Sequence, residues 1–310
     1  MSRMDYEIYR HSLWALCYRM TGSAADAEDL VQETFLRAVE KPPANAERCL
    51  GPWLHRIALN LARDSLRHRQ SRAYVGPWLP SPVPTDALID ARDSEPRTPA
   101  ARYAVMESVS FAFLLALEVL SPTQRAVLLL RDVFDWSTAE TAAALDESEA
   151  NVKTTLHRAR KAMVPYDEAA RRAPPRDLNA RTREVLHRVL QALAHEDHAG
   201  LAVLLAEECA AYSDGGGEFF AARKPLQGRE RVLRFYSSIA AQRSMASRVE
   251  LIELNRMPAL VYHWRPAETR AGHPTRAALL LDIEAGGLVR RVYSVLATSK
   301  LTALSTASGQ

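Results

Sequence analysis

The residues best suited to contact an anionic partner lie between positions 149 and 161. This stretch is rich in Lys, Arg and His, and its one acid is Glu149 at the start. Helical spacing places Val152, Leu156 and Ala159 on one inward face. The remaining polar residues are Asn151, Lys153, Thr154, Thr155, His157, Arg158 and Arg160. Such side chains hold phosphates and read base edges in the major groove of DNA, although a solvated basic face is the simpler alternative.

A second cationic stretch covers residues 55–72. Five arginines face a single acid, Asp64, and the arginines are Arg56, Arg63, Arg67, Arg69 and Arg72. The aromatic residues Trp53, Tyr74 and Trp78 lie near its ends. Basic side chains near aromatic rings suit unpaired nucleic acid, because charge holds the backbone while rings stack on bases. An exposed charged helix without a ligand is the alternative interpretation.

The elements around residues 149–161 predict a helix-turn-helix at about 137–161. Ser137 and Glu140 form a capping box that opens a short helix ending at Leu145. A turn follows, and Ser148 is the predicted N-cap of a helix that stops near Pro165. Two short helices joined by about three residues are typical of this DNA-binding motif.

The chain upstream divides into helices and a linker. Apolar periodicity predicts helices over 6–20, 27–39 and 53–69, with Ser23 as an N-cap, and therefore an all-α domain over 1–72. Residues 73–100 contain six prolines and the acids Asp86, Asp90, Asp93 and Glu95, so we expect an extended acidic linker. A second all-α domain is predicted over 101–168, with a further capping box at Ser121 and Gln124.

The last third of the chain predicts a separate α+β domain over 177–300. Its expected helices are Thr182–Ala194, His198–Leu205 and Gly228–Ala241. Its expected strands, forming a mostly antiparallel sheet, are Cys209–Ser213, Arg248–Leu254, Leu260–Trp264, Ala277–Asp282 and Leu288–Leu296. The whole chain is therefore expected to be multidomain, with two all-α domains before an α+β domain.

Composition narrows the function classes. The 310 residues are 47% hydrophobic and 25% charged with a net charge of +3, as in a globular protein of two or three domains. The three cysteines are far apart, so we expect neither a disulfide framework nor a metal site, and no cofactor is predicted. The longest apolar stretch, around Phe111–Leu120, is too short for a bilayer and carries Glu118. We expect a cytoplasmic protein without membrane contact.

Three ordered motifs together resemble the extracytoplasmic-function family of bacterial RNA polymerase sigma factors. Residues 23–38 resemble its polymerase-binding segment, 53–64 its promoter-melting segment, and 120–125 with 152–160 its region 4. The resemblance implies core RNA polymerase, through its β′ clamp and β flap, and promoter DNA as partners. It also implies that the acidic linker threads through polymerase near the template.

The resemblance further implies roles for individual residues. The polymerase-binding set is Asp29, Gln32, Glu33 and Phe35. The set near the −10 element is Asn60, Arg63, Asp64 and Arg67, beside Leu59, where the family more often has a polar residue. The set at the −35 element is Asn151, Lys153, Thr154, Thr155, His157, Arg158 and Arg160.

The last third resembles the SnoaL-like, or nuclear-transport-factor-2-like, cone that extends some of these sigma factors. Its mark is an aspartate followed by three glycines and usually a lysine. Here the loop is Asp214, Gly215, Gly216, Gly217 and Glu218, so an acid replaces the lysine. Glycines permit sharp turns and close approach of the backbone. The family interpretation is a regulatory contact made by this loop, and a plain hairpin is the alternative.

Members of this fold include isomerases and cyclases. Residues that could serve a reaction or a small-molecule ligand are Tyr212, Asp214, Tyr236, Tyr262, His263 and Trp264. No closely spaced catalytic pair stands out, and a fold does not fix a function. The main hypothesis is a non-enzymatic sigma factor regulated in cis by its C-terminal domain. The alternatives are a helix-turn-helix regulator that acts without polymerase, and such a regulator fused to a ligand-binding or isomerase/cyclase-like enzyme domain.

Overall fold

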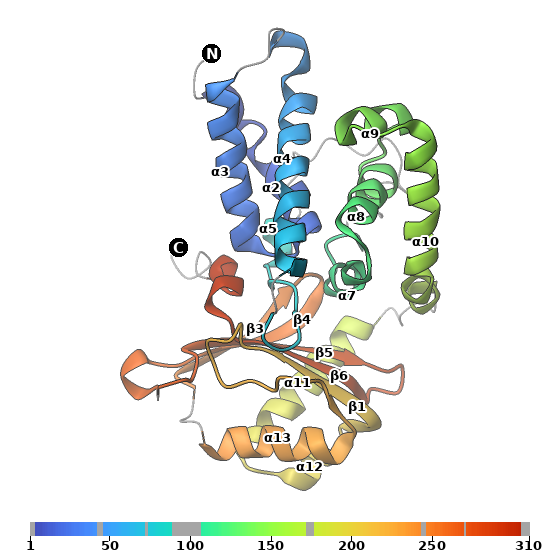
Figure 1. The fold of residues 1–310 in the computed structure, drawn as a ribbon. Coiled ribbons are helices and arrows are strands. Elements are labelled where there is room, and N and C mark those ends of the chain that lie inside the picture. Colours follow the sequence, from blue (N-terminus) through green and yellow to red (C-terminus); the bar gives the residue numbers. More distant parts are fainter. Residues whose placement is uncertain are drawn as a thin grey trace. The chain divides into compact units, whose positions relative to one another are not determined.

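The computed structural model describes residues 4–41, 46–71, 74–88, 107–171, 177–242, 246–269 and 271–304. These residues form two units (Figure 1). The described residues of the first unit are 4–41, 46–71, 86–88 and 107–171. Those of the second unit are 74–85, 177–242, 246–269 and 271–304. Asp90, Asp93 and Glu95 of the predicted acidic linker lie outside the described residues.

The first part of the first unit is a bundle of helices. Its helices are α1 (Met4–Glu7), α2 (Arg10–Thr21), α3 (Ala24–Glu40) and α4 (Ala46–Ser71), with the short α5 (Thr85–Leu88) further along the chain. Ser23 caps α3 as predicted, because its hydroxyl accepts a hydrogen bond from the Asp26 N–H at 3.2 Å. The core contains fully buried Leu13, Leu16, Val31 and Leu54.

The second part of the first unit contains the helix-turn-helix. Its elements are α7 (Phe111–Ala116), η1 (Leu117–Val119), α8 (Pro122–Leu128), the π turn η2 (Leu129–Val133), α9 (Thr138–Leu145) and α10 (Glu149–Arg171). Both predicted capping boxes are present, at Ser121 with Gln124 and at Ser137 with Glu140. Asp146 ends α9 in the left-handed conformation at φ 57°, a role that glycine or asparagine usually takes.

The predicted ends of two helices are wrong. The helix expected over His198–Leu205 ends at Ala202, and Leu205 begins a strand. The helix expected to stop near Pro165 continues to Arg171, with Pro165 inside α10. A proline costs a helix one backbone hydrogen bond and often bends it, but flanking turns that are otherwise favourable can carry the helix past it. None of the described helices is both long enough and apolar enough to cross a membrane.

The second unit is a six-stranded mixed sheet with helices on one face (Figure 1). Its helices are α11 (Leu178–Ala194), α12 (His198–Ala202) and α13 (Arg229–Gln242), and short 3-10 turns occur at η3 (Pro266–Glu268), η4 (Thr298–Lys300) and η5 (Thr302–Leu304). Its strands are β1 (Leu205–Asp214), β2 (Leu226–Gln227), β3 (Arg248–Leu254), β4 (Met257–His263), β5 (Arg276–Ile283) and β6 (Val289–Val295). This is the α+β fold that the sequence predicts.

The strand order is β2-β1-β6-β5-β4-β3. The pair β1–β6 is parallel and the other pairs are antiparallel, so the expectation of a mostly antiparallel sheet is confirmed. Cys209 and Ala211 of β1 pack into the core beneath the helices. Side chains alternate along a strand, so Tyr212 and Asp214 lie on the opposite face.

Candidate nucleic-acid interface

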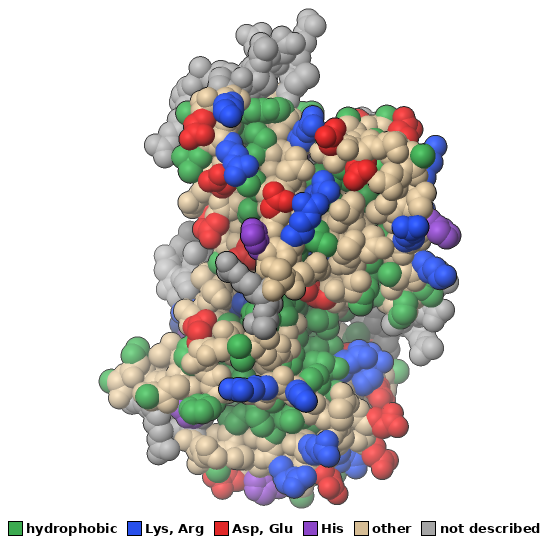
Figure 2. Space-filling model, in the orientation of Figure 1, with side chains coloured by type: hydrophobic (Ala, Val, Ile, Leu, Met, Phe, Trp, Pro, Cys, Tyr) green, Lys and Arg blue, Asp and Glu red, His purple; other side chains and the backbone are tan. Residues whose placement is uncertain are grey.

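The outer face of α10 is the most exposed cationic surface among the candidate sites. Val152, Leu156 and Ala159 are buried as predicted, and Met163 joins them. Asn151, Lys153, Thr154, His157, Arg158 and Arg160 are exposed, and Thr155 is half-buried. Lys161, which the predicted set omits, is also exposed. Cationic side chains gather along α10 in Figure 2.

Three residues of this set are already engaged within their own part of the fold. Arg160 forms an ion pair with Asp132, with Nη2 to Oδ1 at 2.6 Å, and this hydrogen-bonded partner raises the pKa of the guanidinium. Asn151 donates to Glu147 at 2.6 Å, and the Thr154 hydroxyl donates to the Ala150 carbonyl at 3.0 Å. Arg160 is therefore neutralised by a neighbour, whereas Lys153, His157 and Arg158 make no ion pair with the described residues.

The predicted −10 set divides into exposed and buried members. Asn60, Asp64 and Arg67 of α4 are exposed, and Arg67 pairs with Asp64 at 2.8 Å. Arg63 is 8% exposed, and its guanidinium donates to the Leu145 carbonyl at 3.4 Å and to the Thr123 hydroxyl at 3.3 Å. Burial lowers the pKa of Arg63. The structure therefore places Arg63 apart from the exposed members of its predicted set.

The burial of Leu59 explains why an apolar residue occupies a position where the family more often has a polar one. Its side chain is fully buried, so this position of α4 contributes to the core. An apolar residue fits such a position better than a polar one, because a buried polar group without a partner is destabilising.

The predicted polymerase-binding set on α3 also divides. Asp29 and Gln32 are exposed, and Glu33 forms an ion pair with Arg37 at 2.7 Å. Phe35 is half-buried, with its ring 6.0 Å from that of Tyr6 and beneath the Arg10 guanidinium at 5.3 Å. Its ring therefore packs within the bundle.

The exposed apolar residues of α3 are Leu36 and Val39, at 60% and 63% exposure. They share the exposed side of α3 with Gln32, because helical residues three and four apart are neighbours. The sequence gives one indication of this exposed apolar surface, which is the pair of apolar side chains at adjacent positions 35 and 36. Of these two adjacent residues only Phe35 packs inward, and the sequence does not identify which one does.

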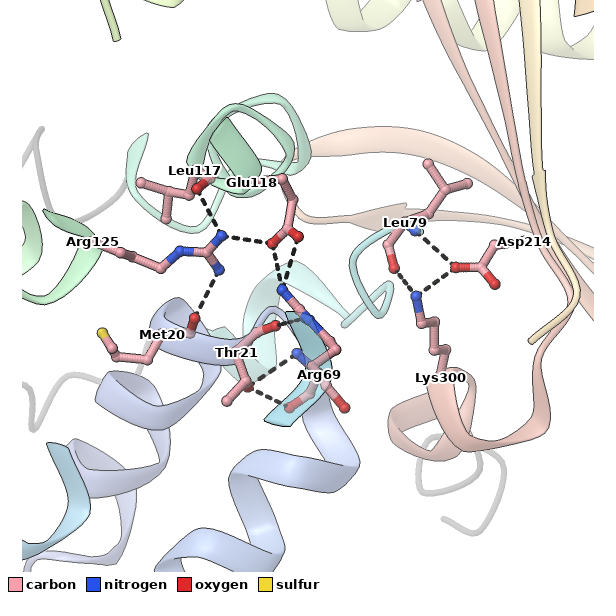
Figure 3. Close-up of polar contacts among 10 residues, drawn as sticks. Met20, Thr21, Arg69, Leu79, Leu117, Glu118, Arg125, Asp214 and Lys300 are labelled. Carbon is pink, nitrogen blue, oxygen red and sulfur yellow. Dashed lines mark hydrogen bonds and ion pairs between the residues drawn. The ribbon is translucent and has the colours of Figure 1, made fainter. Parts of the chain in front are cut away.

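Asp214 in the glycine loop is buried and fully hydrogen-bonded (Figure 3). Its Oδ2 accepts from the Leu79 N–H at 2.7 Å and forms an ion pair with Lys300 Nζ at 2.5 Å. Its Oδ1 accepts from the Tyr74 hydroxyl at 2.5 Å and from the Gly216 N–H at 3.1 Å. Lys300 also donates to the Leu79 carbonyl and lies over the Trp78 ring at 4.0 Å.

The glycines make this loop sterically possible. Gly216 and Gly217 have φ of 60° and 79°, values that residues with a Cβ rarely adopt. A Cβ on Gly215 would lie 2.8 Å from the Phe219 carbonyl oxygen, which is closer than packed atoms allow. Glu218, which replaces the usual lysine, is exposed, and Lys300 supplies the cation for Asp214 from a distant part of the sequence.

Residues 74–85, which we call the tether, are bound to the second unit at both ends. Beyond the contacts of Asp214, the Asn255 side chain accepts from the Val83 N–H at 2.9 Å and its own N–H donates to the Val83 carbonyl at 2.9 Å. Leu79 and Val83 are buried. The prediction of one extended linker over 73–100 is therefore wrong for these residues, which pack as part of the second unit.

The residues that could serve an enzyme are divided between the two faces of the sheet. Tyr236 donates or accepts a hydrogen bond with Ser294 at 2.8 Å on the helical side, where burial also raises the pKa of Tyr262. Tyr262 stacks on Trp264 with centroids 5.7 Å apart, and Tyr212 stacks on Tyr293 at 5.6 Å. His263 Nε2 lies 2.7 Å from Glu250 Oε1. The candidates therefore lie on both faces of the sheet, with Tyr236 and Tyr262 together on the helical side.

A small cavity under the helices is lined by apolar side chains and Tyr236. Its volume is about 20 Å³, and its lining residues include Val189, Leu201, Leu279 and Val292. A cavity of this size has room for about one water molecule. This cavity therefore has no space for a drug-sized ligand.

Comparisons with known proteins match these elements to the sigma factors. The family model of Sigma-70 region 2 matches residues 6–72, and that of Sigma-70 region 4 matches residues 110–163. We use "region 2" and "region 4" for these two ranges.

Relatives in Mycobacterium tuberculosis extend the match. The chain is 45% identical over 167 residues to "ECF RNA polymerase sigma factor SigG", covering 50% of this chain and 45% of SigG, so it spans less than half of that relative. It is 34% identical over 238 residues to "ECF RNA polymerase sigma factor SigJ", covering 76% of this chain and 72% of SigJ. The crystal structure of SigJ matches 97% of this chain and 99% of its own, at a TM-score of 0.65 and 26% identity. The resemblance inferred from the motifs is confirmed.

Proposed function

The chain belongs to the extracytoplasmic-function family of RNA polymerase sigma factors, and we propose that it guides core RNA polymerase to promoters in the cytoplasm. The observation that carries this proposal is α10. It presents an exposed cationic face at the second position of a capped helix-turn-helix, in a chain that also contains region 2. A helix in this position enters the major groove in helix-turn-helix proteins, where its side chains contact base edges and phosphates.

At the −35 element we propose that Lys153, His157 and Arg158 make the main contacts. All three are exposed and unengaged by ion pairs within the described residues. Asn151, Thr154 and Thr155 lie with Lys153 in the first two turns of the helix, where base edges are usually read. Arg160 would orient α10 through Asp132 before it contacts a phosphate.

At the −10 element we propose that α4 contacts the promoter through Asn60, Asp64 and Arg67. Their exposure supports this role. Arg63 would join them only after it leaves the Leu145 carbonyl, to which it now donates a hydrogen bond.

For polymerase we propose a contact on α3 made by Asp29, Gln32, Glu33, Leu36 and Val39, against the β′ clamp, while region 4 meets the β flap. Exposed apolar residues beside polar ones are typical of protein–protein interfaces. Phe35 would act indirectly, by packing α3 against Tyr6 and Arg10. A helix-turn-helix regulator that does not enter polymerase needs no such surface.

We further propose that the second unit regulates transcription in cis by holding the tether. The tether lies between region 2 and region 4 in the chain, so its conformation limits how far the two promoter-binding regions can separate. The buried contacts of Asp214 with Tyr74, Leu79 and Lys300 support this role for the glycine loop. The small size of the apolar cavity beneath the helices supports a mechanical role over catalysis.

In-vitro transcription tests the proposal. Core polymerase is combined with the full chain, or with a truncated chain ending at 171, on a genomic promoter library, and transcripts are mapped. We expect specific start sites that depend on the protein and altered output from the truncated chain. Absence of specific transcripts with both forms would contradict the sigma-factor proposal. Equal output from both forms would contradict only regulation in cis.

A further inference from the structure

Arginine side chains donate hydrogen bonds between region 2 and region 4 within the first unit. Arg63 and Arg69 come from α4 of region 2, and Arg125 comes from α8 of region 4. Arg63 and Arg69 donate hydrogen bonds to oxygens of region 4, and Arg125 donates to an oxygen of region 2. Region 4 is therefore attached to the helix that we propose reads the −10 element.

Glu118 of region 4 holds two of these arginines (Figure 3). Arg69 Nη2 lies 2.8 Å from both Glu118 oxygens, and Arg125 Nη2 lies 2.7 Å from Glu118 Oε1. Arg69 also donates to the Thr21 carbonyl at 2.6 Å, and Arg125 to the Met20 carbonyl at 2.8 Å. We call Glu118, Arg69 and Arg125 the clasp. One carboxylate thus joins the end of α4 to region 4.

Arg63 occupies a different environment six residues earlier on α4. Its acceptors across the boundary are uncharged, the Leu145 carbonyl and the Thr123 hydroxyl. Leu145 is the last residue of α9, where the carbonyls at a helix C-terminus carry partial negative charge. Arg63 therefore caps the first helix of the helix-turn-helix, although a carboxylate or a phosphate would be a stronger partner for a guanidinium.

The position of Arg63 makes α4 a surface that region 4 and DNA would both bind. We propose that the C-terminus of α9 occupies, on Arg63, the place of a promoter-strand phosphate, so that region 4 and single-stranded −10 DNA compete for α4. The clasp holds region 4 in this position. This inference rests on the proposed function, because it takes α4 as the −10 helix.

The energetics favour such an exchange. Burial of a cation against uncharged oxygens leaves part of its desolvation uncompensated. A nucleic-acid phosphate would supply the missing negative charge and would release counterions on binding. Region 4 remains in place because the clasp adds to the weak cap at Arg63. Weakening the clasp should therefore uncover Arg63 without any change at Arg63 itself.

The experiment uses the full chain without polymerase and two readouts. The first is modification of arginines by phenylglyoxal, mapped by mass spectrometry as the reactivity of Arg63 relative to exposed Arg67 on the same helix. The second is the affinity for a fluorescein-labelled single-stranded DNA of 25 nucleotides and mixed sequence. The clasp variants are Glu118→Gln and Arg69→Gln, and Glu40→Gln on exposed α3 is the matched control.

We expect Arg63 to be protected from phenylglyoxal in the wild type and to become about tenfold more reactive in both clasp variants. This factor corresponds to a loss of about 1.4 kcal/mol in the free energy that holds region 4 on α4. Arg69→Gln removes a positive charge, so a gain in this variant excludes a general charge effect. Glu118→Gln should bind the DNA more tightly than Glu40→Gln, and Glu118→Gln with Arg63→Ala should lose that gain.

Three results would overturn the inference. They are equal reactivity of Arg63 and Arg67 in the wild type, no gain of Arg63 reactivity in folded clasp variants, and retention of the DNA gain when Arg63 is replaced. Circular dichroism establishes whether each variant is folded. If Glu118→Gln does not fold, Arg69→Gln still tests the inference. None of these readouts uses polymerase, so failure of the transcription assay remains a separate result.

Discussion

Lys300 and Asp214 form an ion pair with 2.5 Å between Nζ and Oδ2, and both also bond to the backbone of the same residue, Leu79. Asp214 accepts from the Leu79 N–H, and Lys300 donates to the Leu79 carbonyl. All the participating groups are buried. A pair of opposite charges therefore fixes the tether by satisfying both backbone groups of one of its residues.

Replacement of Asp214 by Asn should release the first end of the tether. Removing one partner of a buried ion pair leaves the other charge uncompensated and typically costs about 3–5 kcal/mol. We expect a lower melting temperature for the second unit and faster amide hydrogen exchange at Leu79. Glu218→Gln is the matched control, because Glu218 is exposed in the same loop. Unchanged exchange at Leu79 in Asp214→Asn would show that the tether is held by other contacts.

Replacement of Arg158 by Ala should weaken promoter binding by about 1–3 kcal/mol at one base position if this residue reads a base. Arg160→Ala is the comparison, because Arg160 is on the same helix but already paired with Asp132. We expect its effect to be smaller and equal for all sequences. Both effects are measured as the affinities of the polymerase complex, formed with each variant, for promoters with single substitutions in the −35 element. A uniform loss for Arg158→Ala would identify a phosphate contact instead.

Local sequence signals predicted most of the secondary structure. The capping boxes at Ser121 and Ser137 depend only on residues three positions apart, and both are found where the sequence places them. The recognition helix follows from the spacing of Val152, Leu156 and Ala159, which are all buried. Motifs of consecutive residues were likewise sufficient to indicate the family.

The missed features depend on contacts between distant residues. Lys300 joins Asp214 across 86 positions and Leu79 across 221, and no local pattern marks such a pair. Arg63 and Arg67 lie on nearby parts of one helix, but only Arg63 meets Leu145 of region 4. The sequence therefore indicated which residues are cationic, whereas tertiary packing decided which of them are exposed.

Replacement of Leu36 by Asp should weaken binding to core polymerase while leaving the fold intact. Leu36 is exposed, so its loss removes little core packing. The minority of interface residues that dominate binding each contribute more than about 1 kcal/mol, which is roughly fivefold in affinity, and we expect Leu36 to be one of them. Val203→Asp is the control, because Val203 is similarly exposed in the second unit. Pull-down with core polymerase measures the effect. Full binding by Leu36→Asp at an unchanged melting temperature would remove this face of α3 from the proposed interface.

The stability of the first unit should fall at acidic pH because of His55. Its Nδ1–H donates to the Gly51 carbonyl at 2.8 Å, its ring lies 6.3 Å from that of Trp136, and burial lowers its pKa. The folded state therefore holds His55 neutral, while the unfolded chain binds a proton below about pH 6.5. The contribution of His55 to the free energy of unfolding is therefore complete above that pH. It is lost as the pH falls towards the lower pKa of the folded state, at about 1.4 kcal/mol per pH unit. Urea unfolding at pH 7.5 and 5.5 should show a larger decrease for the wild type than for His55→Gln. His187→Gln, at an exposed position of the second unit, should decrease as the wild type does. An equal decrease in wild type and His55→Gln would contradict a neutral His55.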